Sequence, residues 1–172
     1  MRIAGICGPF GSRTKQLAML LEKAIADKTP VILIEEESFY KADLQLDIDR
    51  LLAAIREAEG IVIVVGQFLF EDAALRNALN IKVFMSEDKD SCLCNHLTAP
   101  RSQSVTLDSL LREYEEKLKP ANDHRINPSQ KHADIIVPSS THFKVPLSLL
   151  LSAVTTIDQA PKLARSHSHG FF

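Results

Sequence analysis

The sequence predicts an α/β fold with a five-stranded, mostly parallel sheet. Short apolar runs of strand length alternate along the chain with amphipathic stretches of helical spacing, which is the pattern of strands joined by crossover helices. One run, Ile61–Val65, consists entirely of β-branched residues, as expected for a strand that is buried on both faces. The 172 residues are 45% hydrophobic and 24% charged, a globular composition in a chain of single-domain length.

The first half of the chain supplies three strands and two helices. The predicted strands are apolar runs bounded by glycine, proline or charged residues: Ile3–Cys7, Val31–Ile34 and Ile61–Val65. The first helix follows from four apolar residues at helical spacing: Leu17, Leu20, Leu21 and Ala24. The second helix spans Asp47–Ala58, and Gly60 is its stop signal.

The second half adds two strands and two helices. The strands are Ile81–Met85 and Ile135–Val137, and the helices are Leu107–Lys119 and Val145–Val154. Thr106 is the expected cap of the first of these helices, and Pro120 is its expected stop.

The chain turns polar from Thr155 onward and shows no internal repeat. This composition predicts one domain over residues 1–154 and a C-terminal tail over residues 155–172.

Charge and hydropathy exclude several classes of protein. Twenty Lys and Arg against twenty-two Asp and Glu give a charge of −2, without the basic excess of a nucleic-acid-binding protein. No apolar run reaches about 18 residues, so we expect no membrane span, and the run Met1–Cys7 is too short for a signal peptide. Three cysteines, an odd number, indicate reduced thiols and a cytoplasmic protein. Cys92, Cys94 and His96 lack a fourth ligand and the usual zinc spacing, so no metal site is predicted.

The loop after the first strand, Gly8–Lys15, lies where open α/β sheets bind ligands. A strand, a glycine-containing turn and a helix start form the setting of a phosphate loop. When the consensus G-x-x-x-x-G-K-[ST] is placed on Gly8, however, its second glycine falls on Arg13, its lysine on Thr14 and its hydroxyl on Lys15. The candidate phosphate-binding residues are Gly8, Gly11, Ser12, Arg13, Thr14 and Lys15. The alternative is a tight strand-to-helix turn that binds no phosphate.

Four further segments resemble motifs of uridine kinases, in the same order along the chain. These are Val31–Lys41, Ile61–Gly66, Leu75–Met85 and Tyr114–Pro138, the last following the pattern QY…VKP…EPSKKYADIIIP. On these segments the chain, from about Met1 to Val154, is identified as a member of the uridine kinase/phosphoribulokinase group of P-loop proteins. The resemblance implies a three-layer P-loop NTPase-like fold and an ATP- and Mg²⁺-dependent transfer of a phosphoryl group to a nucleoside or similar small molecule.

The resemblance also assigns roles, and several positions depart from the family pattern. Glu37 matches the family's aspartate before Ser-Phe-Tyr and is the candidate catalytic base, unless it is only part of a solvated acidic run. Val65 stands where the family has a glutamate. Arg101 is the one arginine left in the lid segment, as a candidate phosphate ligand, and Pro100 is expected to break the lid helix. The stretch 41–59 is too short for the β-hairpin region that helps enclose the nucleoside in the family.

Three interpretations remain open. The chain is an active small-molecule kinase with Arg13 and Lys15 on the phosphates and Glu37 as base, and then needs ATP and Mg²⁺. Alternatively, it is a degenerate relative that binds a nucleotide or another phosphate-bearing small molecule without efficient transfer. In the third interpretation it uses the fold only as an interaction surface, as a homo-oligomer. The combined departures favour the second and third interpretations, because function depends on the site and not on the fold.

Overall fold

The computed structural model describes residues 2–27, 29–100, 105–138 and 142–156. Five parallel strands form one sheet in the order β2-β3-β1-β4-β5, which confirms the predicted fold class. The strands are β1 (Arg2–Cys7), β2 (Val31–Glu35), β3 (Ile61–Gly66), β4 (Ile81–Ser86) and β5 (Ile135–Pro138), close to the predicted runs.

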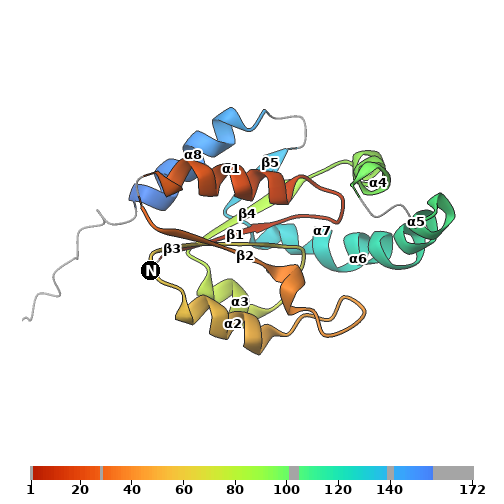
Figure 1. Ribbon diagram of the computed structural model, residues 1–172, viewed down its shortest axis with the longest axis horizontal. Helices are drawn as coiled ribbons and strands as arrows, with labels where there is room; N and C mark the ends of the chain where they lie inside the picture. Colours follow the sequence, from red (N-terminus) through yellow and green to blue (C-terminus); the bar gives the residue numbers. More distant parts are fainter. Residues whose placement is uncertain (1, 28, 101–104, 139–141, 157–172) are drawn as a thin grey trace, which may run out of the picture.

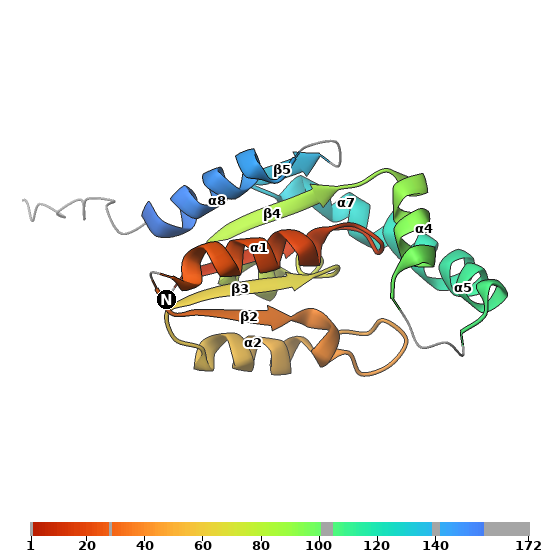
Figure 2. The ribbon, with the colours of Figure 1, turned by 45° about the horizontal axis from the view of Figure 1, so that its top comes forward.

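Helices cover both faces of the sheet, giving three layers (Figures 1 and 2). On one face lie α1 (Thr14–Ala26) and α8 (Lys144–Thr156), and on the other lie α2 (Ile48–Glu57) and α3 (Ala73–Ala78). Successive strand residues point to opposite faces. Ala4 and Ile6 therefore join the core under α1 and α8, whereas Ile3 and Cys7 join the core on the α2 side.

The register of the strands brings their carboxyl ends to one edge of the sheet. Cys7, the last residue of β1, lies opposite Gly66 in β3 and Phe84 in β4. The loops after β1, β2, β3 and β4 therefore gather at this edge, where the candidate site was expected.

The same edge carries α4 (Lys89–Thr98) and a long helical segment that leads back to β5 (Figure 2). The helical segment begins with α5 (Leu107–Glu113) and passes through the short α6 (Lys119–Ala121) and α7 (Asn127–Ser129). As predicted, Thr106 caps its start by accepting from the N–H of Ser109.

The prediction that this helix stops at Pro120 is wrong. The helical segment continues past Pro120. One π-helical turn, Tyr114–Leu118, lies just before Pro120, and a second, Asn122–Ile126, lies just before Pro128. In each case the residue before the proline, Lys119 or Asn127, donates its N–H to the carbonyl five residues back. The wider turn gives the following proline, which has no N–H, a place without the clash that it makes in a regular helix.

The connection between β2 and α2 contains more structure than one loop. Residues Glu36–Phe39 form a 3-10 turn, and an isolated antiparallel bridge then joins Tyr40 to Leu46. At the tip of this one-bridge hairpin, Asp43 and Leu44 have positive φ angles of 40° and 61°. The expectation that no residues are left for a hairpin in this stretch is therefore wrong, because the chain forms this small one.

At the C-terminus, α8 runs two residues beyond the predicted Val154, to Thr156. The rest of the predicted tail, residues 157–172, lies outside the described residues. Within the described ranges the helices are too short or too polar to cross a membrane.

Candidate functional site

The loop Gly8–Lys15 connects β1 to α1 and is packed tightly on its own side chains. The N–H of Ser12 donates to the carbonyl of Pro9 at 3.0 Å, which closes a turn. A Cβ placed on Gly8 would lie 2.9 Å from Ser12 Oγ and 2.7 Å from Thr14 Cγ2. Gly11 has a φ of +83°, and a Cβ there would collide with the Cys92 carbonyl of α4. Glycine is therefore required at both positions because of close packing and, at Gly11, backbone conformation.

Two asparagines hold this loop from outside. Asn122, buried in the second π-helical turn, accepts from the N–H of Phe10 at 2.7 Å and donates to the Phe10 carbonyl at 3.2 Å. Asn95 of α4 donates to the carbonyl of Gly11 at 2.8 Å. A phosphate loop binds its ligand through backbone N–H groups. In this loop, the N–H groups of Phe10 and Ser12 already donate to protein oxygens.

Both candidate cations of the loop are bonded to carboxylates. Arg13 Nε lies 3.3 Å from Glu87 Oε2, just after β4, and the Glu87 side chain is only 3% exposed. Lys15 Nζ lies 2.6 Å from Glu35 Oε2, at the end of β2, and 3.3 Å from Glu37 Oε1. The hydrogen bond with Glu35 raises the pKa of Lys15 and lowers the pKa of Glu35.

The structure brings Lys15 and the predicted base, Glu37, to one small recess. Its volume is only about 30 Å³, and its lining is drawn from α1 and the ends of β2 and β3: Thr14, Lys15, Glu35, Glu37, Val65, Gly66 and Gln67. Small-molecule sites usually have about 300–1,000 Å³, so this recess does not hold a nucleoside. Val65 contributes no polar group at the family's glutamate position. Arg101 lies outside the described residues.

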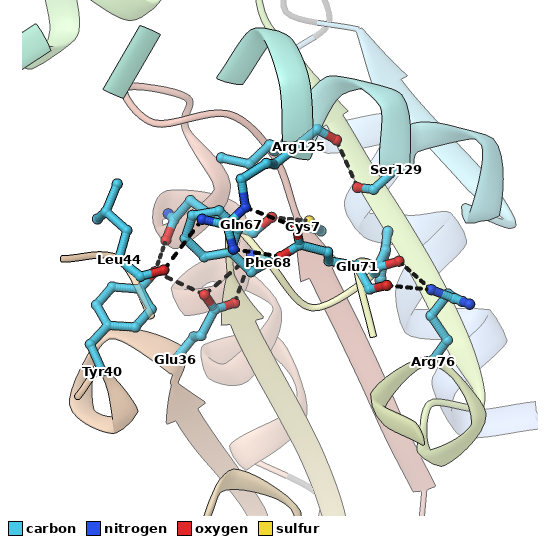
Figure 3. A network of polar contacts seen from close by, with 12 residues as sticks. Cys7, Glu36, Tyr40, Leu44, Gln67, Phe68, Glu71, Arg76, Arg125 and Ser129 are labelled. Carbon is cyan, nitrogen blue, oxygen red and sulfur yellow. Dashed lines mark hydrogen bonds and ion pairs between the residues drawn. The ribbon is translucent and has the colours of Figure 1, made fainter. Parts of the chain in front are cut away.

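Glu36, which the sequence reasoning did not single out, is buried and forms a polar network with Tyr40 and Phe68 (Figure 3). Its carboxylate accepts from the Tyr40 hydroxyl at 2.8 Å and from the Phe68 N–H at 3.0 Å. Burial raises the pKa of Glu36 to about 7. The sequence contains no signal that separates Glu36 from its acidic neighbours, because Glu36 and Glu37 lie in a 3-10 turn, where the alternation of a strand no longer applies.

No group of three or more His, Cys, Asp or Glu among the described residues is arranged to hold a metal ion. All three cysteines are free, with Cys7 and Cys92 buried and Cys94 exposed. Burial raises the pKa of Cys92 to about 12, so its thiol stays protonated at neutral pH.

The overall fold, a parallel sheet with helices on both faces, is similar to that of solved small-molecule kinases. Shikimate kinase from Acinetobacter baumannii, solved in complex with shikimate, has this fold, with a TM-score of 0.61 and 12% identity over 93% of this chain and 96% of that chain. Shikimate kinase from Bacteroides thetaiotaomicron gives a TM-score of 0.57 at 17% identity, covering 88% of this chain and 97% of that chain. The three-layer P-loop NTPase-like fold predicted from the resemblance is thereby confirmed.

In sequence, the chain is similar to uridine kinases, as its motifs indicated. The uridine kinase of Geobacillus sp. (strain WCH70) is 28% identical over 123 residues, 71% of this chain and 57% of that protein. The uridine kinase of Anoxybacillus flavithermus is 30% identical over 102 residues, 59% of this chain and 48% of that protein. The chain thus spans about half the length of these relatives. No family model matches it.

Proposed function

We propose that this chain is a uridine kinase-like protein in which transfer of a phosphoryl group from ATP to a nucleoside or similar small molecule is weak or lost. One observation carries the proposal: Lys15, the lysine nearest to the phosphate-loop position, is bonded to Glu35 at 2.6 Å and to Glu37 at 3.3 Å. Phosphoryl transfer depends on cations that stabilise charge on the transferred group. Here a phosphate has to compete with two carboxylates for the lysine.

A phosphate would also have to compete for Arg13 on the other side of the loop, because Arg13 is bonded to Glu87, whose side chain is nearly fully buried. With Glu35, Glu37 and Glu87, the neighbourhood has three carboxylates against two cations, so its local charge is negative and repels a polyphosphate.

By resemblance, an active form would use ATP and Mg²⁺. The residues of the loop Gly8–Lys15 do not fit the triphosphate of ATP with its Mg²⁺. The lysine position is Thr14, which is 2% exposed and packed on Gly8, and the hydroxyl position is Lys15. We therefore assign no reaction step to a bound nucleotide, and we keep Glu37 only as the candidate base of any residual transfer.

A second candidate function is nucleotide binding without transfer. Ser12 Oγ favours it, because this hydroxyl is buried in the loop and has no hydrogen-bond partner among the described residues. A buried hydroxyl without a partner is costly, and an anion bound in the loop would satisfy it. Protein interaction as a homo-oligomer is the remaining alternative. For the compartment we propose the cytoplasm, because the three cysteines are free thiols.

The test measures transfer of labelled γ-phosphate from ATP to uridine and cytidine, and binding of Mg²⁺·ATP by calorimetry. We expect transfer at or near background, and binding without transfer would favour the second candidate. A robust rate that Glu37→Gln abolishes and Glu36→Gln preserves would overturn the proposal and establish Glu37 as the base.

A matched variant tests the cause. The triple substitution Arg13→Gly, Thr14→Lys and Lys15→Ser restores the consensus spacing from Gly8 and removes the ion pairs to Glu87 and Glu35. If altered loop residues are the cause of weak binding, the triple variant binds Mg²⁺·ATP more tightly than the native chain. Equal binding by the two chains would assign the cause to the contacts of Asn122 and α4 instead.

A further inference from the structure

Two cavities outside the loop adjoin at one pair of side chains. The larger, about 560 Å³, lies between the hairpin tip at Asp43 and Leu44 and the helical segment from Lys117. The smaller, about 190 Å³, lies between Phe70 and Glu71 and the end of the same helical segment. His124 and Arg125 line both cavities, so the two adjoin, and no residue of the loop Gly8–Lys15 lines either one. The two cavities together are called the groove.

Arg125 at the junction is held in a fixed orientation (Figure 3). Its Nε and Nη2 donate to the two carboxylate oxygens of Glu71 at 2.8 and 2.7 Å, and its guanidinium lies 4.1 Å from the ring centroid of Phe68. The hydrogen bond with Glu71 raises the pKa of Arg125, so its charge is permanent. Nη1 reaches the carbonyl of Leu44 at 3.5 Å. An arginine has five N–H donors, so N–H groups remain for a ligand.

The smaller cavity carries a surplus of positive charge. Glu71 is the one acid among its lining residues, and it is already bonded to Arg125. Lys131, also in the lining, forms no ion pair within the part of the chain that the structure describes. Burial and the positive charges of Arg76 and Lys131 lower the pKa of His132.

The larger cavity supplies apolar surface from Leu44, Pro120 and Ala121. Its rim contains the consecutive positive φ angles of Asp43 and Leu44, which non-glycine residues adopt only when the surroundings hold them there. An ion pair between Lys117 and Asp43, at 3.2 Å, helps to hold this backbone conformation. The volume of the groove lies in the range of small-molecule sites.

We propose that this groove binds a small phosphate monoester with an apolar or aromatic remainder. The phosphate lies in the smaller cavity between Arg125, Lys131 and His132, and the remainder extends along Leu44 and Ala121. This site is separate from the loop and is independent of whether the loop binds ATP.

Phenyl phosphate is a suitable probe, because it has a phosphate monoester and an aromatic ring and no nucleotide features. We expect it to bind in calorimetry, more tightly than inorganic phosphate. We also expect it to raise the pKa of His132, measured from its ring proton by NMR, since a nearby dianion stabilises the protonated ring. Lys131→Ala and His132→Ala are expected to weaken binding about tenfold each, as charge-assisted hydrogen bonds do.

Arg13→Ala is the matched control, because it removes a cation of the loop and leaves the groove intact. Unchanged affinity in Arg13→Ala supports the groove. Loss of binding in Arg13→Ala but not in Lys131→Ala would move the ligand to the loop and overturn the proposal. An unchanged pKa of His132 at millimolar phenyl phosphate, or equal binding of inorganic phosphate, would also overturn it.

Discussion

The loop Gly8–Lys15 and the groove at Arg125 both carry cations, but their cations have different partners. In the loop, Arg13 and Lys15 are each bonded to carboxylates from the ends of neighbouring strands. In the groove, Arg125 is bonded to Glu71 and Lys117 to Asp43, whereas Lys131 forms no ion pair with the described residues. The difference shows that a glycine turn with nearby cations does not define a phosphate site. Whether the cations can bind a phosphate depends on the acids that the fold places beside them.

The side chain of Phe68 lies between the two regions and contacts both. Its ring contacts Phe10 of the loop at a centroid distance of 5.8 Å, and the guanidinium of Arg125 lies over it from the groove side. Glu36 fixes the Phe68 backbone through its N–H. Changes at Phe68 therefore reach both regions, whereas changes in either region alone do not.

The largest expected effect follows from Phe68→Ala. Phe68 is 2% exposed, so its truncation leaves a cavity and is expected to cost about 4 kcal/mol of unfolding free energy in urea denaturation. Phenyl phosphate binding should weaken as well, because Arg125 loses its ring. Phe84→Ala, at a fully buried position in β4, is the control. It should lose a similar amount of stability and keep its affinity for phenyl phosphate. Equal binding losses in both variants would show that Phe68 has no special role between the two regions.

The next effect concerns Glu36 and pH. Its folded-state pKa of about 7 is above the ordinary value of 4.5, so the folded protein binds this proton more tightly than the unfolded chain does. The stabilisation is complete below pH 4.5 and is lost as pH rises through 7, by about 3 kcal/mol. Glu36→Gln keeps an acceptor for Phe68 and should flatten this dependence in urea denaturation from pH 4.5 to 8. A native profile that matches that of Glu36→Gln would contradict the raised pKa.

A smaller effect is expected from Asn122→Ala. This change removes both hydrogen bonds to Phe10 and leaves its partly buried N–H without an acceptor, at a cost of about 1 kcal/mol. Amide exchange of Phe10 should accelerate by more than the global change in stability predicts. Asn95→Ala, which removes one exposed bond to Gly11, should affect exchange at Phe10 little. Unchanged exchange at Phe10 in Asn122→Ala would mean that Asn122 does not hold the loop.

The sequence predicts the five strands well, because strands buried on both faces require continuous apolar runs such as Ile61–Val65. It does not predict the carboxylate partners of the loop cations. Glu35 and Glu87 are far apart in sequence, and only the order of the sheet brings the ends of β2 and β4 to either side of the loop. The prediction of a helix stop at Pro120 failed because the π-helical turn Tyr114–Leu118, which accommodates this proline, has no signal in the local sequence.

The last pair of variants should change stability least, and its phenyl phosphate affinities distinguish the loop from the groove most directly. Lys15→Gln and Lys131→Gln make the same substitution at two exposed lysines, one in the loop and one in the groove. Exposed ion pairs contribute less than about 1 kcal/mol, so neither variant should shift the urea midpoint measurably. Their phenyl phosphate affinities should differ. Removing Lys15 takes a cation that is already bonded to two carboxylates, Glu35 and Glu37, whereas removing Lys131 takes a cation that the phosphate uses. We therefore expect native-like affinity in Lys15→Gln and about tenfold weaker binding in Lys131→Gln. The reverse ranking would mean that the loop, despite its carboxylates, is the anion site of this fold.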